Sequence, residues 1–318
     1  MNNYSFEYLN KKILLLIAAT STLFLVRCTP ESEFEKLQQA SDIRIETYLS
    51  ENGINAIQSD HGLYYEMLTK NQTGQIPKVG EVLAIKYEIK TLDGKLLESK
   101  NEDSTLLRFG WNYILPNGLN YGFDTIKKGE KIRLYLPSYL AYHAYGNADQ
   151  FVPNTNFIVD LELVDISTEA QIYARQLDQI RDHITANISK EITSTDSGLF
   201  FQSLEPGDGA EAATNHTAKI HYKRTYLDGT LIQQTEEDKP LTVRLDTDQL
   251  VKGFKEGVLK MREGEKALLI MPADIGFGAS VKVIPGTIRQ ELWEEGYIGS
   301  LVDSYKIVVY EVELIELN

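Results

Sequence analysis

The sequence repeats one arrangement of turns and strands at a fixed offset of 135 residues. The corresponding pairs are Gly129-Glu130-Lys131 and Gly264-Glu265-Lys266, Pro137 and Pro272, and Leu92-Asp93-Gly94 and Leu227-Asp228-Gly229. Separate features that recur at one offset indicate a tandem of two similar domains.

Each copy is predicted to form an antiparallel sheet with one short helix. In the second copy Val251, Phe254, Val258 and Met261 recur every three or four positions, as on one face of a helix. Alternating apolar and polar residues predict strands before and after this helix, and the Asp-Gly pairs predict hairpin turns. Several strands in series with one short helix between them define an α+β fold.

The second copy is longer than the first. The final strands, at Leu161-Glu162-Leu163 and Val312-Glu313-Leu314, lie 151 residues apart, so the second copy carries about sixteen extra residues. These fall near residues 286–304. They form either a lid over a pocket or a surface excursion, and the sequence slightly favours the excursion.

A helical segment precedes each copy. Charged, helix-favouring residues run from Glu31 to Asn52, where Asn52-Gly53 supplies a stop. Before the second copy, five apolar residues fall on one helix face: Tyr173, Leu177, Ile180, Ile184 and Ile188. This face is expected to pack on a neighbouring domain or on a second chain, and the oligomeric state stays open.

The first 27 residues have the pattern of a signal peptide. Lys11 and Lys12 precede an uncharged apolar run, residues 13–26, which is short for a membrane span. Cys28 follows it and is the only cysteine, so no intrachain disulfide can form. Residues 25–28 resemble the lipobox of bacterial lipoproteins, in which the cysteine is lipidated. The alternative is an uncleaved N-terminal anchor with an idle thiol.

The lipobox resemblance implies a location in the bacterial cell envelope. Acyl chains on Cys28 would hold the protein at a membrane surface, expected to be the outer membrane on its periplasmic or surface side. The net charge of −14 over 318 residues argues against binding to nucleic acid and against electrostatic adhesion to anionic lipid. The five histidines show no metal-ligand spacing, so neither a metal nor another cofactor is expected.

The order of motifs resembles that of the FKBP-type peptidyl-prolyl isomerases. In the second copy it runs from a strand tyrosine and Asp-Gly through an apolar pair, Gly-aromatic-x-Glu-Gly, Gly-Glu-Lys and Ile-Pro to Val-Glu-Leu. The resemblance covers residues 207–318 and, less strictly, 79–166. It implies a twisted antiparallel sheet curled around a short helix. The predicted parts are a signal peptide (1–27), a tether and helix (28–55), a divergent first domain (56–166), a linker helix (167–195) and a second domain (196–318).

The reaction that this resemblance implies is rotation about the peptide bond before proline. That bond resists turning, with a barrier of about 18 to 20 kcal/mol, and both isomers are populated in X-Pro amides. No covalent bond breaks, so no nucleophile is needed. An apolar pocket that desolvates the imide, with one or two donors to its carbonyl, suffices.

The resemblance also implies which residues form the pocket of the second domain. Tyr222 lines it, one of Leu250 and Val251 supplies a backbone N–H to the substrate carbonyl, and Phe254 takes the place of a floor tryptophan.

Other positions of the second pocket depart from the family pattern. Leu241 stands for an aromatic wall residue and Tyr310 for a phenylalanine of the last strand. Phe277 replaces a tyrosine whose hydroxyl contacts the substrate. Ile232 and Gln233 stand where the family has phenylalanine and then aspartate, so the pocket loses a hydroxyl and a carboxylate.

The first domain keeps polar groups but loses the aromatic floor. The positions that match the family's pocket are Tyr87, Leu97, Glu98, Ile114, Leu115, Leu119 and Tyr142. Tyr87 and Tyr142 match the two pocket tyrosines, and Glu98 retains an acid at the aspartate position. Leu119 replaces the floor tryptophan.

Two functions follow from these patterns. The first is a peptidyl-prolyl isomerase that assists the folding of exported proteins, with X-Pro-containing polypeptides as clients and the second domain as the catalyst. The alternative is a pair of non-catalytic binding modules in a chaperone or assembly lipoprotein. The number of intact pocket positions does not separate the two.

Overall fold

The computed structural model describes residues 32–318. The predicted signal peptide and Cys28 lie outside the described residues, and the predictions made for them remain predictions. The first described element is helix α2 (Glu33–Glu51), where the charged segment predicted a helix.

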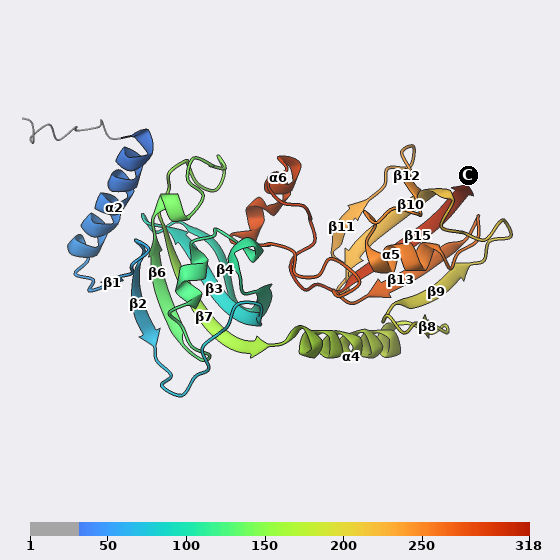
Figure 1. Ribbon diagram of the computed structural model, residues 1–318, viewed down its shortest axis with the longest axis horizontal. Helices are drawn as coiled ribbons and strands as arrows, with labels where there is room; N and C mark the ends of the chain where they lie inside the picture. The colour runs from blue at the N-terminus through green and yellow to red at the C-terminus, as the bar shows by residue number, and fades with distance from the viewer. Residues whose placement is uncertain (1–31) are drawn as a thin grey trace, which may run out of the picture. The chain divides into compact units, whose positions relative to one another are not determined.

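The first repeat is built on an antiparallel six-stranded sheet (Figure 1). Its strands in spatial order are β1 (Ile57–Gln58), β2 (Tyr64–Thr69), β6 (Lys131–Leu136), β7 (Phe157–Ser167), β3 (Val82–Thr91) and β4 (Leu96–Arg108). Its shorter elements are η1 (Trp111–Tyr113), β5 (Ile114–Leu115), α3 (Leu119–Phe123) and η2 (Ser138–Leu140).

The second repeat is built on a seven-stranded sheet. Its strands in spatial order are β11 (Leu231–Gln234), β10 (Thr217–Tyr226), β15 (Val308–Leu317), β13 (Lys266–Met271), β9 (Phe200–Glu205) and β8 (Thr193–Ser194), and β12 (Leu241–Arg244) also pairs with β10. The remaining elements are α4 (Glu169–Asn187), α5 (Lys252–Val258), β14 (Lys282–Val283), η3 (Gly286–Ile288) and α6 (Arg289–Glu294).

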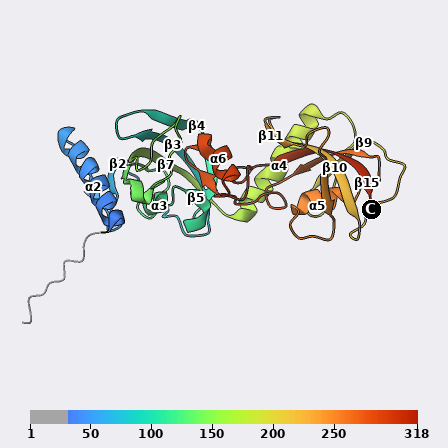
Figure 2. The same ribbon diagram turned by 90° about the horizontal axis from the view of Figure 1, so that it is seen from above.

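The two sheets have the same topology. The order β2-β6-β7-β3-β4 in the first corresponds to β9-β13-β15-β10-β11 in the second. In each repeat one short helix lies against the sheet, α3 against β6 and α5 against β13 (Figures 1 and 2). Gly94 and Gly229 have φ of 94° and 85°, the left-handed conformation that a hairpin turn requires. The α+β prediction of two repeats is therefore confirmed.

Helix α4 links the repeats and packs on the second sheet. Thr168 and Gln171 form a capping box at its first turn. Its apolar face packs in a cluster with Phe200, Ile270 and Ile307. Of the two partners predicted for this face, the structure shows a neighbouring domain of the same chain.

A buried polar network joins the second half of α2 to the first repeat. The Ser41 hydroxyl donates to the side-chain oxygen of Asn156, 2.5 Å away, and accepts from the backbone N–H of Ser138 at 2.9 Å. The Asn156 amide nitrogen donates to the Ser41 carbonyl at 2.8 Å. Buried polar groups that satisfy one another in this way fix the position of a helix.

The variant Asn156→Ala is expected to lower the free energy of unfolding by about 1–3 kcal/mol, because it removes the acceptor of the buried Ser41 hydroxyl and one of the two acceptors of the Ser138 backbone N–H. Urea denaturation measures the change. Asn101→Ala, at an exposed position, is the matched control and should have almost no effect. An equal change in both variants would contradict the role given to this network.

The inserted residues of the second repeat do not form the surface excursion that the sequence favoured. We call residues 282–298 the docking segment. Five of its residues belong to the core cluster of the first repeat: Val283, Ile284, Ile288, Leu292 and Ile298. The preference for an excursion was wrong because these apolar side chains have a hydrophobic surface to bury, and it lies on the other repeat.

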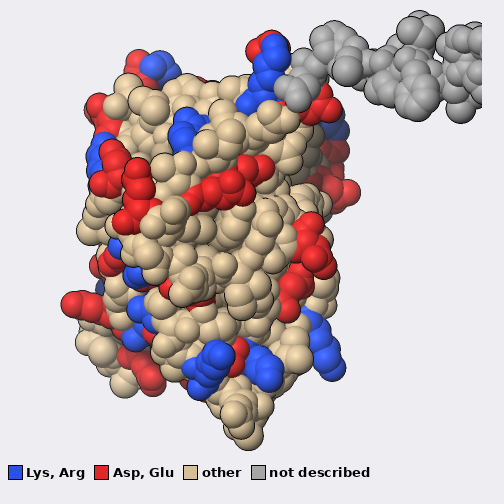
Figure 3. Space-filling model, turned by 90° about the vertical axis from the view of Figure 1, so that its left-hand side faces the viewer, with Lys and Arg blue, Asp and Glu red and all other residues tan. Residues whose placement is uncertain are grey.

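On the face drawn in Figure 3, side chains of both charges are scattered among uncharged residues, and no continuous basic surface appears there. Within residues 32–318, no helix combines the length and the apolar character that a membrane crossing requires.

Candidate functional site

Three aromatic rings from three elements meet where the second pocket was predicted. Tyr222 comes from β10, Phe254 from α5 and Tyr310 from β15. The ring centres of Phe254 and Tyr310 lie 4.9 Å apart, and that of Tyr222 lies 6.2 Å and 5.8 Å from them. Gly257 lets α5 approach the sheet, since a Cβ there would lie 2.4 Å from the Leu269 side chain.

The remaining predicted residues of this pocket surround the three rings. Ile232, Leu250, Val251 and Phe277 are half-buried and pack against the same core cluster. Leu241 is half-buried on β12, where it pairs with Ile220 of β10.

Gln233 accepts a hydrogen bond from the Tyr222 hydroxyl at 3.1 Å. Burial raises the pKa of Tyr222 and of Tyr310, and the Arg224 cation offsets this only in part. Both phenols therefore stay protonated at neutral pH.

Arg224 occupies a position in this pocket that sequence reasoning missed. Its guanidinium lies 4.7 Å from the ring centre of Phe277, and its nitrogens donate to the Tyr310 hydroxyl at 3.1 Å and to the Gln233 side-chain oxygen at 2.8 Å. The residue is 8% exposed, its Nε has no hydrogen-bond partner, and no carboxylate of residues 32–318 forms an ion pair with it. A buried cation therefore fills part of the apolar pocket.

The strand alternation carried the signal for Arg224. Ala218, Ile220, Tyr222 and Arg224 are spaced by two, so they share the face that points at the core. The same alternation that predicts the strand therefore extends as far as this charged residue.

The structure brings the seven predicted pocket residues of the first repeat together. Tyr87, Leu97, Ile114 and Leu119 are buried in one core cluster, and Leu115 and Tyr142 pack against it. Tyr87 is 1% exposed, whereas its counterpart Tyr222 is half-buried. Tyr87 is thus covered, whereas Tyr222 keeps part of its surface exposed even though the adjoining rings of Phe254 and Tyr310 are each 4% exposed.

The docking segment covers the first pocket. Strand β14 runs parallel to β5, with Lys282 opposite Ile114 and Val283 opposite Leu115. Ile284 donates its backbone N–H to the Leu115 carbonyl at 2.8 Å, and the Tyr142 hydroxyl donates to the Ile284 carbonyl at 2.9 Å. The carbonyl that Tyr142 contacts is the one that precedes Pro285.

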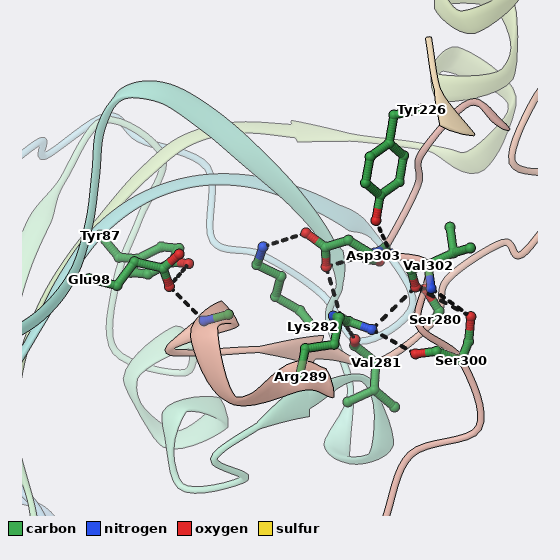
Figure 4. Close-up of polar contacts among 12 residues, drawn as sticks. Tyr87, Glu98, Tyr226, Ser280, Val281, Lys282, Arg289, Ser300, Val302 and Asp303 are labelled. Atoms are coloured by element: carbon green, nitrogen blue, oxygen red, sulfur yellow. Dashed lines mark hydrogen bonds and ion pairs between the residues drawn. The ribbon is translucent and has the colours of Figure 1, made fainter. Parts of the chain in front are cut away.

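Glu98 forms the other end of this contact. One carboxylate oxygen accepts from the Tyr87 hydroxyl and from the backbone N–H of Gly286, each at 2.7 Å (Figure 4). Burial raises the pKa of Tyr87, and the nearby Glu98 charge raises it further, so Tyr87 remains a donor. The acid predicted at this position therefore holds backbone from the second repeat.

A buried ion cluster links two residues of the docking segment to Asp303, which follows it in the chain. Asp303 lies between Lys282, 2.7 Å from its Nζ, and Arg289, 2.9 Å from a guanidinium nitrogen (Figure 4). Burial lowers the pKa of Lys282, and the attraction of Asp303 offsets part of that effect. Burial alone would raise the pKa of Asp303, but the two cations outweigh it and hold the pKa below its ordinary value.

The sequence contained a partial signal for this arrangement. Ile284, Ile288 and Leu292 recur at intervals of four, as an apolar helix face would. Nothing in that spacing identifies the surface that the face contacts.

No group of three or more His, Cys, Asp or Glu side chains within residues 32–318 is arranged to hold a metal ion.

A twisted antiparallel sheet on one short helix, present twice in one chain, is the FKBP type of fold. The family profile described as FKBP-type peptidyl-prolyl cis-trans isomerase matches residues 74–164 and 209–315. The chain belongs to this family.

Individual relatives match parts of the chain. It is 31% identical over 121 residues to the FKBP-type peptidyl-prolyl cis-trans isomerase FkpA of Escherichia coli, over 38% of this chain and 43% of that protein. It is 26% identical over 247 residues to peptidyl-prolyl cis-trans isomerase FKBP9 of Homo sapiens, over 76% of this chain and 36% of that protein. The chain spans less than half the length of either relative.

Among solved structures, the crystal structure of FkpA from Escherichia coli is similar to this chain. The TM-score is 0.36 at 21% identity, over 47% of this chain and 61% of that one.

Proposed function

We propose that this protein is a peptidyl-prolyl cis-trans isomerase whose catalytic pocket lies in the second repeat. One observation carries the choice between the repeats. The second pocket keeps Tyr222, Val251 and Phe277 partly exposed, whereas the first is covered by the chain itself. A client can reach only a pocket whose lining is accessible.

The second pocket has the chemistry that this reaction needs. Tyr222, Phe254 and Tyr310 provide an apolar aromatic lining that can desolvate the imide, which favours the twisted state. By family resemblance, a backbone N–H of Leu250 or Val251 donates to the client carbonyl. No titrating nucleophile is required, because the reaction is a rotation.

The first pocket indicates what the second lacks. There the Tyr142 hydroxyl donates to the carbonyl before a proline at 2.9 Å. We take Phe277, 135 residues after Tyr142, as the equivalent position, and it has no hydroxyl. We expect the second repeat to catalyse more slowly than a pocket with both aromatic lining and hydroxyl.

Full-length protein is expected to accelerate the cis/trans relaxation of an X-Pro peptide. The variant Phe277→Tyr should raise kcat/KM about two- to tenfold, because one neutral hydrogen bond is worth about 0.5–1.5 kcal/mol. A protease-coupled or NMR exchange assay measures both rates. Leu231→Ala, an exposed apolar residue of β11, is the control and should leave the rate unchanged. Rates equal to buffer for wild type and for Phe277→Tyr would refute the catalytic proposal.

Arg224 favours a second candidate function, a binding module without catalysis. A buried guanidinium beside Phe277 and Tyr310 reduces the room for a prolyl ring. Under this alternative the protein would bind extended peptide segments with no change in relaxation rate. Peptide binding without acceleration, in wild type and in Phe277→Tyr, would support it.

The cellular setting belongs to the same proposal. The apolar run at residues 13–26 and Cys28 support a lipid-anchored envelope protein that acts on exported X-Pro clients. Intact-mass analysis of the membrane fraction should find acylated Cys28 as the first residue. A mature chain that still begins at Met1 would refute the lipoprotein assignment.

A further inference from the structure

The contacts of the docking segment with the first repeat are those of a bound peptide. Two backbone groups of Ile284 and one of Gly286 are each paired with a separate group of the first pocket: the Leu115 carbonyl, the Tyr142 hydroxyl and the Glu98 carboxylate. These hydrogen bonds recognise the backbone of the segment, as in peptide recognition by strand addition.

The side chains of the segment are enclosed as well. Val283, Ile284 and Pro285 are buried, and Ile284 packs in the cluster that contains Tyr87 and Leu119. A Cβ at Gly286 would lie 3.3 Å from a Glu98 oxygen, so glycine gives the carboxylate its closest approach. The site therefore fits an apolar residue, a proline, and a small residue that carries a backbone N–H.

We propose that the first pocket is a peptide receptor whose resident ligand is the Val283–Gly286 stretch of the same chain. Its recognition rule is apolar-Pro-Gly directly after a short strand paired with β5, with the N–H after proline donated to Glu98. In the intact protein this receptor is filled, and it joins the two repeats instead of taking clients. It is independent of the activity proposed for the second pocket.

The test uses the full-length chain with Ile284→Asp, which places a carboxylate in the apolar pocket and so displaces the segment. The probe is a fluorescent peptide with the sequence of residues 280–288, and its anisotropy measures binding. Wild-type protein should not bind it at concentrations that saturate the variant. The variant should bind it, and Pro→Ala in the peptide should weaken that binding at least tenfold.

A second peptide isolates the role of Glu98. It carries sarcosine in place of the glycine that corresponds to Gly286, and therefore lacks the N–H that Glu98 accepts. It should bind the Ile284→Asp chain about tenfold more weakly than the glycine peptide. This difference should disappear when Glu98→Gln is added. A folded Ile284→Asp chain that binds neither peptide, or that binds both equally, overturns the proposal.

Amide hydrogen exchange provides a test that does not depend on the folding of Ile284→Asp. In the wild-type chain the amides of Ile284 and Gly286 should exchange slowly. In Glu98→Gln the Gly286 amide should exchange about tenfold faster, while the Ile284 amide keeps its protection through Leu115. Fast exchange of both amides in the wild type would show an unfilled receptor and refute the proposal.

Discussion

Asp303→Asn is expected to lower the free energy of unfolding by about 3–5 kcal/mol, because it leaves Lys282 and Arg289 buried without a counter-charge. The docking segment should then detach from the first repeat. The side chains of Lys282 and Arg289 are 5% and 10% exposed and that of Asp303 is 20% exposed, so solvent screens the cluster poorly. Urea unfolding followed through Trp293, which packs against the core of the first repeat, measures the effect. Trp111→Phe removes the other tryptophan signal.

The exposed ion pair of Arg244 and Asp246 supplies the control. Asp246→Asn should leave the free energy of unfolding almost unchanged, since exposed ion pairs contribute little. Similar losses in the two variants would contradict the role given to the buried cluster.

The same carboxylate predicts a pH dependence. The folded pKa of Asp303 is below the ordinary 3.8, so its stabilising contribution is complete above that value. The contribution is lost as pH falls through the lower folded pKa. Wild-type protein should therefore lose Trp293 burial below about pH 4, and the Asp303→Asn variant should lack that component of the acid transition.

Arg224→Ala is expected to raise isomerase activity about tenfold or more. Removal of the guanidinium opens the space beside Phe277 and Tyr310, and burial of a side chain of prolyl size is worth about 1.5–3 kcal/mol. The substitution also removes a buried charge without breaking an ion pair, because Arg224 forms none with residues 32–318. The relaxation assay with an X-Pro peptide measures the change.

Lys223→Ala is the matched control for Arg224→Ala. Lys223 is the neighbouring cation on the opposite, exposed face of β10, so its removal changes the net charge equally without opening the pocket. Its activity should equal that of the wild type. A fall in activity for Arg224→Ala would mean that the guanidinium donates to the client, and would contradict its role as an obstruction.

Local sequence patterns predicted most of the fold. Alternation with a period of two located β3, β10 and the final strands, and Asp-Gly located the hairpin turns at Gly94 and Gly229. These signals are local, since each depends on neighbours within a few residues. The repeat offset then supplied the domain organisation that no single strand contains.

The two pockets were less predictable than the strands that carry them. Family positions brought Tyr222, Phe254 and Tyr310 together, yet they did not indicate that Arg224 fills part of the same space. The covering of the first pocket was not predictable from spacing, because the apolar face of the docking segment could bury itself against several surfaces. The match to Leu115, Tyr142 and Glu98 depends on contacts between distant parts of the chain.

The pairing of β14 with β5 joins residues 168 positions apart, Lys282 with Ile114. During synthesis from the N-terminus, every residue of the first sheet exists before the strand that closes its pocket has been made. The first repeat therefore keeps its hydrophobic site uncovered until nearly the whole chain has emerged from the ribosome. The domain made first is thus completed only when most of the second has been made, shortly before strand β15 (Val308–Leu317) completes the second sheet.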